Sequence, residues 1–404
     1  MKTVVAGGGP AGLISAYFRA KRGEDVTLIE KNEKLGKKLY ITGKGRCNVT
    51  NDCDEEEFLS NVVSNPKFLM SAIHRFSPEK FINFLEEKVR LKTERGNRVF
   101  PLSDKASDIT KTLEKYAADA GVKIRLNEKV LSINAENGEI CSVSTDKNTY
   151  PCENAIVCTG GMSYPLTGST GDGYNFAKNL GHSIVKPVAA LSGINVKGDF
   201  YKKLQGISLK NVRITVYDGD KKIYEDFGEM LFTHFGVSGP VIISASSYIN
   251  RRDLSKIKFS LDLKPAITEK QLDDRILRDF EKFKNKSLKN SLEALLLKGL
   301  IPVILNAAKI DGEKKNNELT TIERKRLVET IKSFDFYPAS LRDISEAIVT
   351  AGGVSVKEIN SKTMESKLVK GLYFAGEILD LDALTGGFNI TIAATTAYAA
   401  GNAE

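Results

Sequence analysis

The first thirty residues of the chain alternate between two short apolar runs and one run with helical spacing. Residues 2–6 and 26–29 are rich in β-branched side chains and have the pattern of buried strands. Residues 13–22 between them have the apolar spacing of a helix, which is expected to end at Gly23. The pattern therefore predicts a strand–helix–strand unit at the N-terminus.

The turn between the first strand and this helix has the sequence G-x-G-x-x-G. In such a loop the first glycine permits a tight turn, the second lets the backbone approach a pyrophosphate, and the third lets the helix pack close to the strand. The helix N-terminus presents free N–H groups and the positive end of its dipole to the phosphates. Glu30 ends the second strand, eighteen residues after Gly12, where a carboxylate accepts hydrogen bonds from ribose hydroxyls. These features predict a dinucleotide site formed by Gly7, Gly9, Pro10, Ala11, Gly12 and Glu30.

A basic loop and a second glycine-containing stretch follow. Residues 31–38 are polar and basic, and residues 41–51 contain glycines that allow close backbone approach and an arginine that supplies a planar cation. Next to a dinucleotide site this stretch is expected to wrap the cofactor, the alternative being an ordinary glycine turn. Cys47 is compatible with a redox thiol or with simple packing, because the sequence does not report its pKa. The candidate contacts are Lys31, Lys38, Thr42, Gly43, Gly45, Arg46, Cys47 and Asn48.

Two later apolar strands run directly into glycine. Residues 154–158 lead into a Thr-Gly-Gly turn, and residues 372–375 lead into Gly-Glu. A helix of small residues, 390–400, closes the chain, and its N-terminus is predicted to form a second site for an anion or a carbonyl. These segments add Thr159, Gly160, Gly161, Gly376, Glu377, Gly386, Gly387, Phe388, Asn389 and Ile390 to the candidate cofactor site.

The middle of the chain has a different pattern. From about residue 187 short alternating strands dominate, which predicts an antiparallel, barrel-like β domain. Residues 268–333 carry helical stripes on a charged background, starting at the N-cap Thr268 with a glutamine three residues later, and predict a small helical bundle. Residues 54–95 are likewise expected to be helical. His234, in the β domain, is expected to be a structural histidine rather than a proton donor.

Length and composition narrow the class of protein. A chain of 404 residues is expected to form two or three domains. Its 41% apolar and 27% charged content is typical of a globular protein. No apolar run reaches the roughly 18 residues of a membrane helix, and a strand and a phosphate loop occupy the N-terminus where a signal peptide would stand. We therefore expect a cytoplasmic location and no membrane contact.

Charge and cysteine usage narrow the partners. Lys and Arg number 59 against 51 Asp and Glu, for a net charge of +8. This excess is expected to form a solvated basic surface, so a nucleic-acid partner is not expected. The five cysteines form no C-x-x-C pair and the three histidines are scattered, which predicts neither a disulfide framework nor a metal site. The oligomeric state stays open.

Beyond these local patterns, the chain resembles the BaiN-like bacterial flavoproteins, which include aminoacetone oxidases and bile-acid reductases. This family lies within the glutathione-reductase-like superfamily of FAD-binding proteins, and the resemblance covers essentially the whole chain. The sequence departs from the family at Cys158, where the superfamily has the alanine of A-T-G-G, and at Thr391, where the family has glutamine, so no substrate role is assigned to Thr391. The motifs that carry the resemblance are Thr42–Asn51, Ser163–Tyr174, Phe232–Pro240, Thr363–Lys367 and Gly371–Glu377.

The resemblance implies an α/β fold with a split Rossmann-like FAD-binding domain. An antiparallel β-barrel-like domain would interrupt it, and the helical bundle would be inserted into that domain. The implied ranges are 1–190 and 343–404 for the FAD-binding domain, 191–267 and 334–342 for the β domain, and 268–333 for the bundle.

The resemblance also implies a cofactor and its contacts. FAD would bind non-covalently, with Glu30 on the adenosine ribose, Val130 on the adenine through its backbone, and Glu377 on the ribityl chain. The turn over residues 386–391 would approach the pyrimidine end of the isoalloxazine.

The implied function is an FAD-dependent oxidoreductase that acts on a small organic substrate by hydride transfer through the flavin. NAD(P)H would dock transiently as the reductant, because no second G-x-G-x-x-G follows a strand. The alternatives are an oxidase of a small amine such as aminoacetone, with dioxygen as acceptor, and a flavoprotein that binds RNA or a protein partner through the basic helical segment. No catalytic residue is assigned.

Overall fold

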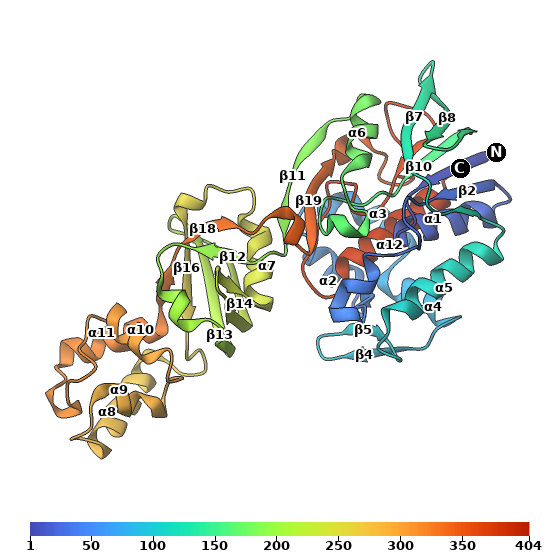
Figure 1. Cartoon of the computed structure of the whole chain (residues 1–404). Helices are drawn as coiled ribbons and strands as arrows, with labels where there is room; N and C mark the ends of the chain where they lie inside the picture. The colour runs from blue at the N-terminus through green and yellow to red at the C-terminus, as the bar shows by residue number, and fades with distance from the viewer. Residues whose placement is uncertain (404) are drawn as a thin grey trace. The chain divides into compact units, whose positions relative to one another are not determined.

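In a computed structural model, which describes residues 1–403, the chain forms two compact units (Figure 1). Unit 1 consists of residues 1–190 and 343–404, and unit 2 of residues 191–342. No helix within residues 1–403 combines the length and the apolar character that a membrane crossing requires.

A five-stranded parallel sheet is the centre of unit 1. The strand order is β20-β10-β1-β2-β6, so segments from both halves of unit 1 lie next to one another. Strands β1 and β10 are buried over nearly their whole lengths, as expected of a parallel sheet covered on both faces. The strands are β1 (Lys2–Ala6), β2 (Asp25–Ile29), β6 (Lys123–Arg125), β10 (Asn154–Val157) and β20 (Leu372–Phe374).

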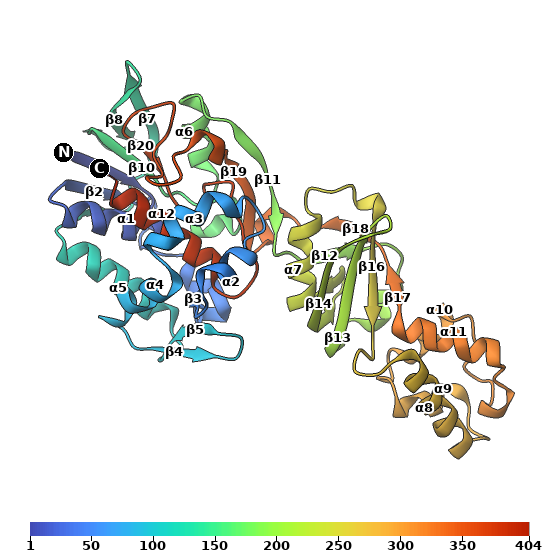
Figure 2. The same cartoon turned by 180° about the vertical axis from the view of Figure 1, so that it is seen from behind.

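Two helices of unit 1 pack closely against each other, α1 (Pro10–Lys21) and α12 (Phe388–Gly401) (Figure 2). A Cβ added to Gly401 would lie 2.6 Å from the Phe18 Cβ, and the Ser15 hydroxyl donates to the Ala397 carbonyl at 3.3 Å. The small residues of α12 permit this approach, as its composition predicts.

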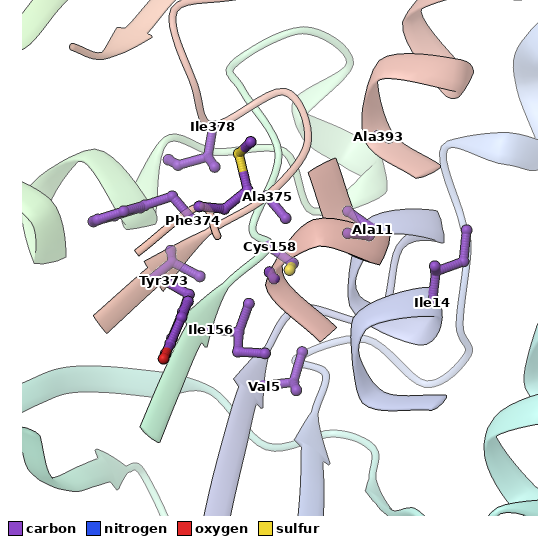
Figure 3. Close-up of a cluster of buried hydrophobic side chains, with 14 of the residues drawn as sticks. Val5, Ala11, Ile14, Ile156, Cys158, Tyr373, Phe374, Ala375, Ile378 and Ala393 are labelled. Atoms are coloured by element: carbon purple, nitrogen blue, oxygen red, sulfur yellow. The ribbon is translucent and has the colours of Figure 1, made fainter. Parts of the chain in front are cut away.

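Apolar side chains fill the space between the central sheet and these helices. Figure 3 shows Val5, Ile156 and Phe374 from three adjacent strands beside Ala11 and Ala393 from α1 and α12. All five side chains are buried, so the ends of these strands stand on a packed core.

The remaining elements of unit 1 surround this centre. Residues 54–95 are mainly helical, as predicted, but residues 91–94 form a strand because they pair with residues 98–101. The helices are α2 (Glu55–Ser60), α3 (Pro66–Arg75), α4 (Pro78–Glu86), α5 (Ala106–Asp119) and α6 (Asp172–Asn179). The smaller sheets comprise β3 (Thr50–Asn51), β5 (Arg98–Pro101) and β4 (Leu91–Glu94); β7 (Val130–Glu136), β8 (Glu139–Thr145) and β9 (Thr149–Pro151); and β11 (Ile184–Ala190) with β19 (Val349–Val354).

Unit 2 contains a seven-stranded sheet whose neighbouring strands are all antiparallel, in the order β17-β16-β13-β14-β15-β12-β18. Its two end strands are successive segments of the chain, separated by Tyr337 alone. The strands are β12 (Ile194–Val196), β13 (Ser208–Asp218), β14 (Lys221–Phe232), β15 (Gly236–Ser238), β16 (Ile257–Asp262), β17 (Phe334–Phe336) and β18 (Pro338–Leu341).

The helices of unit 2 share one core with its sheet. Leu272 and Leu327, from two helices, belong to the same buried cluster as Val216 and Phe259 from the sheet. The predicted capping box at Thr268 is confirmed, because its hydroxyl accepts from the Gln271 N–H and the Gln271 side chain accepts in return. The helices are α7 (Pro240–Ile249), α8 (Glu269–Lys282), α9 (Leu288–Ser291), α10 (Ile301–Ala307) and α11 (Thr321–Lys332).

The expectation that His234 is a structural histidine is wrong. Its side chain is exposed on the turn between β14 and β15, and it contacts the Phe235 ring edge-on at a centroid distance of 5.1 Å. The flanking strand residues Phe232 and Val237 are buried in the core, whereas the turn between them leaves His234 at the surface.

His182 is the buried histidine of the described chain, and it predicts a pH dependence of stability. Its Nδ1 lies 3.2 Å from Glu358 and its Nε2 2.8 Å from the Ser366 hydroxyl. Burial lowers the pKa of His182, and the opposing effect of Glu358 does not restore it. The unfolded chain therefore binds a proton more readily than the folded one, and stability falls as the pH drops through the unfolded value of 6.5.

We expect the free energy of unfolding to decrease between pH 7 and pH 5 by up to about 1.4 kcal/mol per pH unit, the limit for one proton. Urea unfolding of wild type and His182→Gln at both pH values measures this slope. His74→Gln, at an exposed site, is the control and should keep it. A slope that survives in His182→Gln would assign the effect to other groups.

Candidate functional site

The predicted glycine sites follow strands that are neighbours in the parallel sheet. Strands β20, β10, β1 and β2 lie side by side. Because parallel strands end at the same edge, the segments that follow them come together along the carboxyl edge of the sheet, where α/β folds bind their ligands. The segments at this edge are 375–377 after β20, 158–161 after β10, 7–12 after β1 and Glu30 after β2.

The first glycine loop has the geometry that its sequence predicts. Gly7 has φ = +108°, and a Cβ there would lie 2.5 Å from the Cys158 carbonyl oxygen. A Cβ on Gly12 would lie only 1.8 Å from the Gly7 carbonyl oxygen, so strand and helix meet too closely for any side chain. Gly9 differs, because its Cβ would meet nothing within 4 Å. That open space lies at the N-terminus of α1, where no side chain caps the free N–H groups and no acidic residue occupies the first turn.

Glu30 ties this loop to the end of the second strand. Its Oε2 accepts the Gly8 N–H at 2.7 Å, and its Oε1 accepts the N–H and the side-chain amide of Asn32 at 2.8 and 2.6 Å. Since each carboxylate oxygen accepts more than one hydrogen bond, Glu30 keeps capacity for a ribose hydroxyl. Asn32 was missed from the sequence because only the folded loop brings its amide to Glu30.

Glu377 is the centre of a second polar cluster at the same edge. Its carboxylate lies 2.7 Å from the Lys38 ammonium and accepts hydrogen bonds from the Ser163 hydroxyl at 3.1 Å and the Thr350 N–H at 2.9 Å. Lys38 and Glu377, which the sequence predicts as separate contacts and which lie far apart along the chain, thus form an ion pair. Their side chains are partly exposed, so the pair fixes orientation more than it adds stability.

The stretch over residues 41–51 contacts the turn before α12. A Cβ on Gly387 would lie 2.4 Å from the Thr50 carbonyl carbon, so the two backbones touch. The Asn51 amide donates to the Gly386 carbonyl at 3.3 Å, and the hydroxyls of Thr50 and Thr391 lie 2.7 Å apart. The N-terminus of α12 carries neither a side-chain cap nor an acidic residue in its first turn. The structure therefore unites two predicted segments around an uncapped helix end.

Several predicted contacts are occupied by protein groups. Lys31 donates to the Thr170 hydroxyl at 2.6 Å and pairs with Asp172 at 2.7 Å. The Arg46 guanidinium pairs with Glu94 and with Asp104 and lies 4.3 Å from the Phe100 ring centroid. The side chain of Asn389 bonds both backbone groups of Ala383 and so closes its own turn. Val130 lies buried at the start of β7.

Cys47 has the environment of a packing residue. Its side chain is buried with φ = +59°, and burial raises the pKa of its thiol to about 12. A thiol with that pKa is not a thiolate at neutral pH, and the thiolate is the reactive form. The five cysteines are all free.

The polar atoms around the carboxyl edge fit a bound dinucleotide. Buried side-chain oxygens of Thr159 and Ser169, on the loop after β10, of Tyr174, on α6, and of Asn48 and Asn51, on the stretch before α2, have no hydrogen-bond partner among the described residues. Burial, with Glu377 nearby, raises the pKa of Tyr174, so its phenol stays protonated and able to donate. Buried polar groups are normally satisfied, and a ligand with phosphates, hydroxyls and ring carbonyls would satisfy these.

The chain matches the family model described as HI0933-like protein Rossmann domain over residues 1–403. It is 33% identical to the ribosomal RNA dihydrouridine synthase of Haemophilus influenzae over 404 residues, which cover 98% of this chain and 97% of that protein. It is 28% identical to the 3-dehydro-bile acid delta(4,6)-reductase of Clostridium scindens over 405 residues, 99% of this chain and 98% of that protein. Among solved structures, the 3-ketosteroid-delta4-(5alpha)-dehydrogenase of Rhodococcus jostii has the same fold, with a TM-score of 0.54, 14% identity and coverage of 99% of this chain and 95% of that one.

Proposed function

This chain belongs to the HI0933-like protein Rossmann domain family and is an FAD-dependent oxidoreductase, and from that premise we propose that it reduces the C5–C6 double bond of uridine in ribosomal RNA. The resemblance to the BaiN-like flavoproteins is confirmed by the same matches. The observation that carries the proposal is the full-length similarity to the ribosomal RNA dihydrouridine synthase, at 33% identity. Nucleic acid, which composition alone did not favour, thus becomes the proposed substrate.

Both named relatives point to one kind of chemistry. Dihydrouridine is uridine with its ring double bond saturated, and a delta(4,6)-reductase saturates a double bond in conjugation. FAD, when bound and reduced, supplies a hydride to such an electron-poor carbon. The second carbon takes a proton from the protein or from solvent, so two hydrogens are added in total.

The residues of unit 1 would hold the cofactor for this step. Glu30 would bind the adenosine ribose and Glu377 the ribityl chain, while the N–H groups at Gly9 would meet the pyrophosphate. The uncapped N-terminus of α12 would place a positive dipole end at the pyrimidine side of the flavin ring and stabilise negative charge there. NAD(P)H would supply the electrons by transient docking, because the sequence contains no second G-x-G-x-x-G after a strand.

Mass spectrometry of an RNA substrate tests this function. Holoenzyme is incubated with NAD(P)H and ribosomal RNA transcribed in vitro, which carries no modification, and the RNA is digested to nucleosides. We expect a nucleoside heavier than uridine by two hydrogen atoms that coelutes with dihydrouridine. If the enzyme reduced a conjugated steroid ketone and formed no dihydrouridine in the RNA, its substrate would be a small molecule and not RNA. Flavin reduction by aminoacetone with release of peroxide would instead identify an oxidase.

We also infer that the seven-stranded sheet of unit 2 closes into a barrel. Its end strands β17 and β18 pair with opposite edges of the sheet, yet only Tyr337 separates them. One short segment therefore forms the seam at which the first and last strands meet.

A further inference from the structure

The two units differ sharply in charge. Unit 2 contains 28 Lys and Arg against 20 Asp and Glu, whereas unit 1 contains 31 of each. The whole net charge of +8 is therefore carried by the 152 residues of unit 2. A polyanion is drawn to such a surface, because each phosphate contact releases condensed counterions.

Within unit 2, one group of basic side chains is not neutralised. Arg278, Lys282 and Lys286 are exposed at the C-terminal end of α8 and on the turn that follows it, and we call them the α8 basic end. None of the three makes an ion pair among the described residues. Several other basic residues of the bundle are paired with acids, namely Lys289–Glu313, Lys314–Glu323, Arg324–Asp273 and Lys332–Asp262.

An aromatic ring lies among these charges. The Lys282 and Lys286 ammonium groups lie 5.5 and 4.4 Å from the centroid of the half-buried Phe283 ring. The Asn316 amide donates to the Phe283 carbonyl at 2.8 Å and fixes the backbone at this point. Cations beside a partly accessible ring are the combination that binds single-stranded nucleic acid, with phosphates on the cations and a base on the ring.

We propose that unit 2 binds the RNA substrate and that the α8 basic end, with Phe283, contacts its backbone and an unpaired base. The inference rests on the proposed function, which supplies the RNA, and adds the surface that holds it. RNA is favoured over an acidic protein because the charge excess extends over a whole unit and because the local cluster includes a ring suited to base stacking.

A neutralised variant tests this surface in the full-length holoenzyme. In Arg278→Gln/Lys282→Gln/Lys286→Gln three charges are removed, and the matched control Lys67→Gln/Lys111→Gln/Lys115→Gln removes three exposed charges from unit 1. Binding of unmodified ribosomal RNA to the oxidised enzyme is measured as a function of salt. We expect at least about a tenfold loss of affinity, and a salt slope lower by about 2, for the α8 variant. In the control the decrease of the salt slope should be less than a third of the decrease in the α8 variant, and the RNA affinity should stay near that of wild type.

Cations near a helix C-terminus also stabilise the helix, so folding is measured alongside binding. FAD content and the thermal midpoint should match wild type, and Arg278→Lys/Lys282→Arg/Lys286→Arg should restore RNA affinity. A second measurement uses wild type: bound RNA should protect Lys282 and Lys286 from acetylation. The inference would be overturned if both neutralised variants lost RNA affinity equally, or if bound RNA did not protect the two lysines from acetylation. It would also be overturned if the α8 variant kept its affinity for RNA and lost affinity only for a ribosomal protein.

The outcomes separate this inference from the proposed function. If RNA binding depends on the α8 basic end but no dihydrouridine forms, the RNA-binding surface is supported and the proposed reaction is refuted. If dihydrouridine forms but the α8 variant binds RNA as wild type does, the reaction is supported and the RNA-binding surface is refuted.

Discussion

Gly12→Ala is expected to cost more than about 3 kcal/mol of folding free energy, whereas Gly9→Ala is expected to leave folding unchanged and to weaken FAD binding alone. A Cβ at position 12 would lie 1.8 Å from the Gly7 carbonyl oxygen, so strand β1 and helix α1 would have to separate. Overpacking of this kind costs typically 1–3 kcal/mol, and a clash with backbone lies at or beyond the upper end. At position 9 a Cβ meets no protein atom within 4 Å and the backbone is extended, so alanine fits the protein.

The alanine at position 9 would, however, occupy the space through which a pyrophosphate reaches the helix N-terminus. We expect FAD to bind about 5- to 150-fold more weakly, the equivalent of 1–3 kcal/mol. Urea unfolding of the two apoproteins and titration with FAD measure both quantities. Unchanged FAD affinity in Gly9→Ala would place the pyrophosphate elsewhere.

Glu30→Ala is expected to weaken FAD binding by about 1.5–3 kcal/mol, since the charge-assisted hydrogen bond from a ribose hydroxyl is lost. This corresponds to a loss of affinity of about 10- to 150-fold. The loss includes the support that Glu30 gives to Gly8 and Asn32, and Glu30→Gln, which keeps two acceptor sites, should fall in between. Cys47→Ser should change FAD affinity far less, because Cys47 is buried as a neutral thiol.

Isothermal titration of each apoprotein with FAD makes the comparison, with unfolding curves to show that the apoproteins are folded. The expected order of affinity is wild type, Cys47→Ser, Glu30→Gln and Glu30→Ala. Equal losses for Glu30→Ala and Cys47→Ser would show that the ribose ligand or the role of the thiol is wrongly assigned.

Local patterns predicted the parts of the fold whose signals are local. The G-x-G-x-x-G loop needs three glycines at fixed spacing, and the structure accounts for Gly7 and Gly12 by contacts within that loop and with Cys158. The capping box at Thr268 likewise involves residues three apart. The strands β1 and β10 were recognised because burial on both faces demands an unbroken apolar run.

Contacts between distant segments could not be predicted in the same way. The ion pair of Lys38 with Glu377 and the bond from Thr350 to Glu377 depend on the sheet order, which brings β20 next to β10. The pairing of β4 with β5 overrode a helical expectation for residues 91–94. The exposure of His234 depends on how the turn after β14 leaves the sheet. In each case tertiary context, and not the local sequence, decides the outcome.

Anaerobic re-oxidation measures whether a reduced flavin in this chain delivers its electrons to uridine in ribosomal RNA. The holoenzyme is reduced without oxygen, the excess reductant is removed, and unmodified ribosomal RNA is added while the absorbance of oxidised flavin is followed. We expect the absorbance to return and dihydrouridine to form in an amount equal to that of the flavin re-oxidised. A flavin that stays reduced in the presence of the RNA, and is re-oxidised only when oxygen is admitted, would contradict it.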